Sequence, residues 1–185
     1  MFRRHPRFQV APLSANQLAV LVKANQFMAE GKSSEAGRLF ADVATDMQQS
    51  NHPRRAANLY TRAAHAFADG NNEQAAQDNT RKALSIFMQL KMVNRAQIFF
   101  TNITRKMNHK GMKVAAESLQ RDYDAQIPAL PAQPRNDRQK HGLLPTNCPK
   151  CGATVHGDEV EWVDNDTVEC EYCGTLIRIE GRPTR

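Results

Sequence analysis

An apolar pattern recurs every 20 residues through most of the chain. Each copy opens on an alanine, and the copies begin at Ala36, Ala56, Ala76, Ala96 and Ala116. Apolar side chains follow at offsets of +3, +4, +7 and +11, and the clearest copy continues from Ala96 with Phe99, Phe100, Ile103 and Met107. These offsets stay on one face of a helix with about 3.6 residues per turn. The pattern therefore predicts one helix in every 20 residues, although polar residues weaken the copies that begin at Ala76 and Ala116.

Turn signals separate the copies and predict where the helices end. Turn-forming residues gather at 31–34, 50–53, 69–72, 91–94 and 108–111. Ser14 followed by Gln17 is typical of a capping box, which starts a first helix that stops at Gly31. Pro53 suits a first helical turn, and Pro128 ends the last helix. We expect six helices of roughly 14–18 residues each, paired as three antiparallel hairpins.

Helical hairpins at a fixed period resemble the tetratricopeptide-like α-solenoids. The resemblance covers residues 14–127 and concerns architecture alone. The usual tetratricopeptide repeat has about 34 residues and a Trp/Gly/Tyr signature, neither of which occurs here. A compact six-helix bundle is the alternative. Either form predicts a mainly α domain, and the solenoid implies broad surfaces for other proteins.

The chain changes character after this region. Residues 128–144 contain three prolines and no apolar periodicity, which predicts a polar, Pro-rich linker. Residues 145–180 form a second, small domain, with strands expected at 159–163, 167–170 and 175–179. A domain of about 36 residues cannot bury enough apolar surface to be stable alone. Something besides a hydrophobic core must hold it together.

All four cysteines of the chain lie in this small domain. They form two C-x-x-C-G motifs, at Cys148 and Cys151 and at Cys170 and Cys173. Two such turns at this separation predict a four-thiolate site for one Zn²⁺ ion. With four sulfur ligands no position is open for water or substrate, so the zinc is expected to be structural. Binding of the metal would supply on the order of 10 kcal/mol of folding energy.

The two C-x-x-C-G turns, here called knuckles, resemble those of the zinc-ribbon family. This resemblance implies a small β zinc ribbon. Iron in a rubredoxin-like site has similar ligands, and spacing alone does not separate it from zinc. A pair of redox dithiols is the other alternative. His156 is surplus as a ligand. Trp162, the only tryptophan, is expected to cover the metal site or the small core, or else to anchor a partner.

Charge divides the chain in the same place. The net charge is +6, but residues 1–144 carry 21 Lys and Arg against 11 Asp and Glu, whereas residues 145–180 carry 2 against 8. A basic run includes Arg105, Lys106, Lys110 and Lys113 and is a candidate partner contact, although a solvated face is the usual explanation for such a run. Phosphate would be repelled by the acidic ribbon, so nucleic acid is the less favoured partner. An acidic ribbon could instead dock on the basic helices of its own chain or of a neighbouring chain, and such a contact would be weak and salt-sensitive.

These features favour a non-enzymatic adaptor that binds another protein. The longest apolar run, residues 18–22, is far too short to cross a bilayer, so we expect no membrane insertion. Cysteines spaced for a metal suit the cytoplasm. No phosphate-binding loop, nucleophile elbow or catalytic acid pair is present in the sequence. The alternatives are a nucleic-acid-associated factor and a thiolate-based metal or redox sensor.

Overall fold

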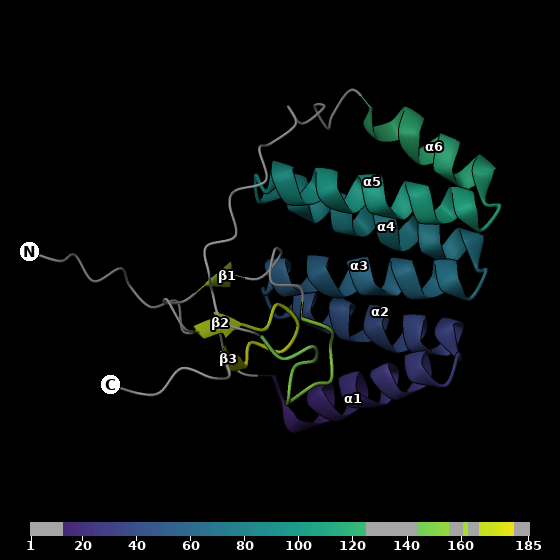
Figure 1. Ribbon diagram of the computed structural model, residues 1–185. Helices are drawn as coiled ribbons and strands as arrows, with labels where there is room; N and C mark the ends of the chain where they lie inside the picture. The colour runs from purple at the N-terminus through teal and green to yellow at the C-terminus, as the bar shows by residue number, and fades with distance from the viewer. Residues whose placement is uncertain (1–12, 125–143, 156–160, 163–166, 180–185) are drawn as a thin grey trace, which may run out of the picture.

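The computed structural model of the protein describes residues 13–124, 144–155, 161–162 and 167–179. The six expected helices are present, and Figure 1 shows them stacked in chain order beside a small sheet. Their bounds are α1 Ala15–Ala29, α2 Ser33–Gln49, α3 Pro53–Asp69, α4 Glu73–Gln89, α5 Val93–His109 and α6 Lys113–Tyr123. The proposed end of the last helix at Pro128 and the linker at 128–144 fall almost wholly outside the described residues.

The 20-residue repeat extends from the helices into the turns between them. Five turn residues spaced by 20 have positive φ angles between 54° and 83°: Gly31, Asn51, Asn71, Lys91 and Gly111. At each turn the N–H of the next residue donates to a carbonyl five positions earlier, as Lys32 does to Phe27 at 2.8 Å. This is the Schellman arrangement, which ends a helix by reversing the chain. Short identical turns make consecutive helices antiparallel neighbours.

Both predicted helix starts are confirmed. The Ser14 hydroxyl accepts from the Gln17 N–H, and the Gln17 side chain accepts from the Ser14 N–H, each at 3.1 Å. Pro53 occupies the first turn of α3. Its missing N–H costs nothing there, because the first N–H groups of a helix have no partner within the helix.

The repeating alanines lie at the centre of the core. Ala36, Ala56, Ala76 and Ala96 are fully buried, and Ala116 is 4% exposed. The weaker copy in α4 is buried as well, because its polar side chains bond to their own helix. Thr80 donates to the Ala76 carbonyl at 2.7 Å and Asn79 to the Ala75 carbonyl at 2.8 Å. Small residues at helix contacts let the helices approach closely.

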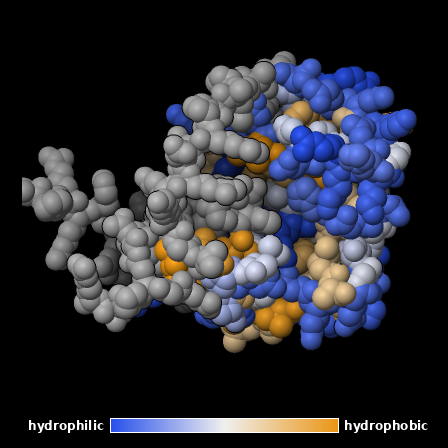
Figure 2. All heavy atoms as spheres, viewed as in Figure 1, coloured by the Kyte–Doolittle hydropathy of each residue, from blue (hydrophilic) through white to orange (hydrophobic). Residues whose placement is uncertain are grey.

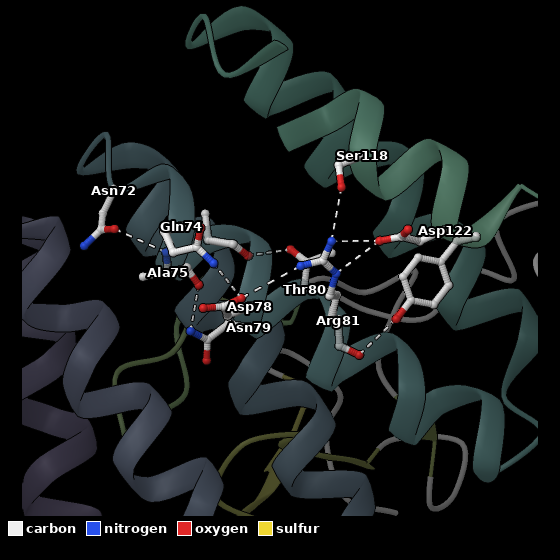
Figure 3. A network of polar contacts seen from close by, with 11 residues as sticks. Asn72, Gln74, Ala75, Asp78, Asn79, Thr80, Arg81, Ser118 and Asp122 are labelled. Carbon is white, nitrogen blue, oxygen red and sulfur yellow. Dashed lines mark hydrogen bonds and ion pairs between the residues drawn. The ribbon is translucent and has the colours of Figure 1, made fainter. Parts of the chain in front are cut away.

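Contacts between alternate helices identify the array as a solenoid of hairpins. In Figure 3, Arg81 of α4 reaches Asp122 and Ser118 of α6, at 2.8 and 3.1 Å. The odd-numbered helices make their own series: Asn58 of α3 accepts from Arg95 of α5 at 3.2 Å, and Asp69 accepts from Lys106 at 2.8 Å. We call the surface formed by α1, α3 and α5 the odd-helix face. None of the described helices combines the length and apolar content needed to cross a bilayer.

The described residues from 144 to 179 form a separate unit, the C-terminal module. Its sheet contains β1 Glu161–Trp162, β2 Thr167–Glu169 and β3 Leu176–Arg178, antiparallel and in chain order. β2 and β3 are shorter than expected, and His156, residues 159–160 and 163 of the first expected strand, and the turn at 164–166 lie outside the described residues. So does the Trp162 side chain, although its backbone belongs to β1. Figure 2 shows a largely hydrophilic helical surface, with hydrophobic residues at the module.

Candidate metal centre

The fold brings the four cysteine sulfurs of the C-terminal module together. All four side chains are buried, and their Sγ atoms lie within 4.8 Å of one another. The Sγ of Cys148 is 3.6 Å from that of Cys173, and Cys151 is 3.8 Å from Cys170. A tetrahedron of sulfurs bonded at about 2.3 Å to one metal ion has edges of about 3.8 Å. Disulfides would need about 2.05 Å. The four cysteines therefore fit one metal ion.

The two knuckles have the same backbone hydrogen bonds. The Cys148 N–H donates to the Ala153 carbonyl at 2.7 Å, and the Cys170 N–H donates to the Thr175 carbonyl at 2.9 Å. In each knuckle the glycine N–H also donates back to the first cysteine's carbonyl. Cysteine binds a metal ion as the thiolate. Each knuckle thus turns two sulfurs toward the centre.

The glycines of the knuckles provide a matched test of how the module is seated. Gly152 and Gly174 have φ angles of 73° and 72°. An added Cβ at Gly152 would lie 3.6 Å from Asn25, an ordinary contact, whereas at Gly174 it would overlap the guanidinium of Arg55. Strain should cost each alanine variant roughly 1–2 kcal/mol. We expect Gly174→Ala alone to loosen the module from the helices, detected as faster proteolysis; equal behaviour of both variants would contradict this contact.

The C-terminal module docks on the odd-helix face of its own chain. Arg55 of α3 lies 3.7 Å from the Glu169 carboxylate, and Arg95 of α5 pairs with Glu171. Asn58 donates to the Glu171 carbonyl at 3.2 Å. From α1, Asn25 donates to the carbonyl of Cys151. Docking of the acidic module on basic helices was one expectation from the charge division, and three odd-numbered helices take part in it.

Two arginines of α3 flank the sulfur cluster. Burial lowers the pKa of both Arg55 and Arg62, while electrostatic attraction, first to Glu169 for Arg55 and to Tyr172 for Arg62 and then to neighbouring cysteines, acts in the opposite direction. A guanidinium stays charged in proteins. Four thiolates outweigh the charge of one divalent ion, so the centre with such an ion bound would be anionic. The two cations therefore match its charge.

A pocket of about 540 Å³ opens on the odd-helix face beside the module. Its walls come from α1 to α5 and from the module residues Thr154, Glu171 and Tyr172. Arg62 contacts two aromatic rings, with its Cζ 4.3 Å from the ring centre of Phe40 and 4.7 Å from that of Tyr172. Phe99 and His65 meet edge to face at 5.6 Å. The pocket combines cations with aromatic walls.

The pocket histidine is expected to make stability depend on pH. Burial lowers the pKa of His65 from 6.5 to about 4, with Lys106 adding to the shift and Asp69 opposing it. Between these values the unfolded chain binds a proton that the folded chain does not, so the free energy of unfolding falls as the pH drops from about 6.5 to about 4. Denaturant titrations at pH 7 and pH 5 should show that the free energy of unfolding falls less for His65→Phe than for the wild type. Replacement of the exposed His109 by Phe should leave the loss unchanged, and an equal loss in all three would contradict the assignment.

The expected partner contacts do not form one site. Arg105, Lys110 and Lys113 are exposed near the turn between α5 and α6, whereas Lys106 faces the pocket and pairs with Asp69. Sequence reasoning missed the residues of α3 that contact the module or the pocket: Arg55, Asn58, Arg62 and His65. Their offsets of +3, +7 and +10 place them on one helix face. That polar stripe within an alanine-rich helix was the available signal.

Comparison with known families extends the tetratricopeptide-like resemblance. Residues 19–125 match the family model of the soluble NSF attachment protein, SNAP. No curated protein and no solved structure shows a significant match to the chain. The matched residues run from α1 to just beyond α6, and they end before the C-terminal module. The match spans more than half of the chain, which therefore belongs to the SNAP family.

Proposed function

We propose that the protein is a non-enzymatic adaptor that binds another protein through its odd-helix face. The observation that carries this proposal is the family match over the helical array, combined with the pocket on that face. The name of the family describes attachment to a second protein, NSF. Helical arrays bury one side of each helix in stacking and leave broad surfaces free for recognition.

We further propose that the metal is one structural Zn²⁺ ion held by Cys148, Cys151, Cys170 and Cys173. Four buried sulfurs with tetrahedral spacing suit zinc and iron, and a closed site without an exchangeable ligand suits a structural role. Its need for reduced thiols suits the cytoplasm. Elemental analysis of the purified chain should give one zinc and no iron. One equivalent of iron would refute this metal assignment.

Two exposed aliphatic residues allow a matched test of the binding face. Ile98 is 44% exposed and lines the pocket, whereas Val114 is 74% exposed on α6 and is not among the pocket's lining residues. Affinity capture from the native source would compare the intact chain with Ile98→Asp and Val114→Asp. We expect a protein that the wild type and Val114→Asp retain to be lost with Ile98→Asp. Equal retention by both variants would place binding elsewhere.

The same experiment separates the adaptor from its nucleic-acid alternative. Nuclease treatment before capture should leave the retained protein unchanged if the contact is direct. If nuclease removes it, and if Arg105→Glu together with Lys110→Glu also removes it, the exposed basic residues at the end of α5 bind nucleic acid instead. Steep loss of binding with salt would accompany that outcome.

A further inference from the structure

The charges that line the pocket are unequally matched. Lys106 is paired with Asp69 at 2.8 Å, and Arg95 is paired with Glu171. Arg62 also lines the pocket, but no ion pair joins it to a carboxylate of the described residues. Three cations and two carboxylates therefore face the pocket. The surplus cation is Arg62.

Arg62 presents a buried nitrogen without a hydrogen-bond partner. Its Nη2 donates to Asn25, and its Cζ contacts the rings of Phe40 and Tyr172, but Nη1 is buried and makes no hydrogen bond among the described residues. A buried N–H of a charged group that lacks an acceptor is costly. A guanidinium that contacts two aromatic rings keeps its N–H groups available for a carboxylate. The geometry thus points to an anionic ligand.

His65 supplies a second unpartnered nitrogen on the same face of α3. It lies one turn beyond Arg62 and lines the same pocket, and its Nδ1 is buried without a partner. A neutral imidazole carries its proton on either nitrogen, so Nδ1 can donate one hydrogen bond. Two donors at a separation of three residues on one helix face can act on one carboxylate. The apolar walls, Phe87, Ile98 and Phe99, would then meet a neighbouring aromatic or aliphatic group.

The protein already seats an acid followed by an aromatic residue on this face. Glu171 of the C-terminal module pairs with Arg95, and its carbonyl accepts from Asn58. The next residue, Tyr172, lies against the guanidinium of Arg62. The module thus shows, within one chain, which side chains the odd-helix face accepts.

We propose that the pocket binds an acidic side chain followed by an aromatic residue, presented by an extended segment of a partner protein. The carboxylate accepts from Arg62 Nη1 and His65 Nδ1, and the aromatic ring packs against the walls from α4 and α5. This inference rests on the proposed adaptor function and specifies the chemistry of the partner. The site exists only while the module is docked, because Tyr172 forms one side of it.

Binding of short peptides to the full-length, metal-loaded chain tests the proposal. The probes are capped tetrapeptides, Ala-Glu-Phe-Ala and its matched Ala-Gln-Phe-Ala, followed by NMR shifts of the Arg62 and His65 side chains. We expect the glutamate peptide to bind about tenfold more tightly or better, because a charge-assisted hydrogen bond contributes about 1.5–3 kcal/mol. Equal affinity for the two peptides would overturn the proposal. So would equally tight binding of free glutamate, which would make the site one for a small acid.

Variants separate the pocket from general surface charge. His65→Phe and Arg62→Met should each weaken the glutamate peptide about tenfold, whereas Arg105→Met, at an exposed position, should not. Arg62 also contacts the module, so Arg62→Met could weaken binding by releasing the module. Arg62→Lys keeps the positive charge and is the control for this effect, and it should retain part of the preference for the glutamate peptide. The proposal fails if the peptide changes the NMR shifts of Arg105, Lys110 and Lys113 instead of those of Arg62 and His65. It also fails if a short RNA displaces the peptide from the pocket.

The two proposals can fail independently. If Ile98→Asp abolishes capture of a protein but the peptides show no acid preference, the adaptor stands and the acidic–aromatic ligand is wrong. If the peptides show the preference but no protein depends on Ile98, the pocket chemistry stands and the adaptor role is wrong.

Discussion

Replacement of Cys151 by serine is expected to unfold the C-terminal module while the six helices stay folded. The module buries few apolar residues besides its cysteines, namely Ala153, Val168 and Ile177 in the part that the structure describes. Structural zinc contributes roughly 10–16 kcal/mol at neutral pH, which such a core cannot replace. The helices keep their own core of alanines and larger residues, so helical circular dichroism should change little.

Metal content and limited proteolysis check this result. The serine variant should hold no stoichiometric metal, and protease should remove its C-terminal segment quickly. Lys150→Ser is the matched control, because Lys150 lies in the same knuckle between two ligands but is exposed and offers no sulfur. Chelation of the wild type should reproduce the serine variant, and zinc should reverse it. A Cys151→Ser protein that retains one metal ion and full protease resistance would show that the sulfurs do not hold the module together.

Arg55→Glu is expected to release the module from the helices without unfolding it. The Arg55 side chain is 7% exposed and lies 3.7 Å from the Glu169 carboxylate. The substitution would place a buried carboxylate against Glu169 and the anionic centre. Loss of one partner of a buried ion pair costs about 3–5 kcal/mol, and the cost is lower here because Glu169 is partly exposed.

Small-angle scattering and metal analysis together distinguish release from unfolding. The radius of gyration should rise while the metal content stays at one ion per chain. Exchange of the charges, by Arg55→Glu with Glu169→Arg, should restore part of the compact form. Arg38→Glu, at an exposed position on α2, is the matched control. An unchanged radius for Arg55→Glu would mean that the ion pair does not hold the module in place.

The helical array could be predicted because its determinants are local. A period of 20 residues, a capping box at Ser14 and a proline at the head of α3 each act within one turn of helix. The left-handed turn residues were harder to foresee. Asparagine tolerates positive φ, as at Asn51 and Asn71, but lysine does so rarely, and Lys91 has a φ of 57° in the same kind of turn.

The metal ligands were predictable for a similar reason, whereas the rest of the site was not. Each C-x-x-C-G motif carries its own turn, so sequence spacing alone indicates where the sulfurs converge. The contacts of Asn25 with Arg62 and of Asn58 with Arg95 join residues 37 apart, which depends on how hairpins stack. The position of the module on α3 depends on packing between two domains that are far apart in the sequence. The polar stripe on α3 indicates a face with polar contacts, but it does not indicate which segment of the chain covers that face.

The docked module changes how the helical array can bend and melt. In a repeat protein each unit touches only its neighbours, so the units flex and unfold nearly one by one. Here a single accessory contacts α1 through Asn25, α3 through Arg55 and α5 through Arg95. The module thus contacts one helix of each of the three hairpins, and it couples the motion and unfolding of the first hairpin to those of the third. Loss of the metal ion from the C-terminal module should therefore make the unfolding of the helical array less cooperative.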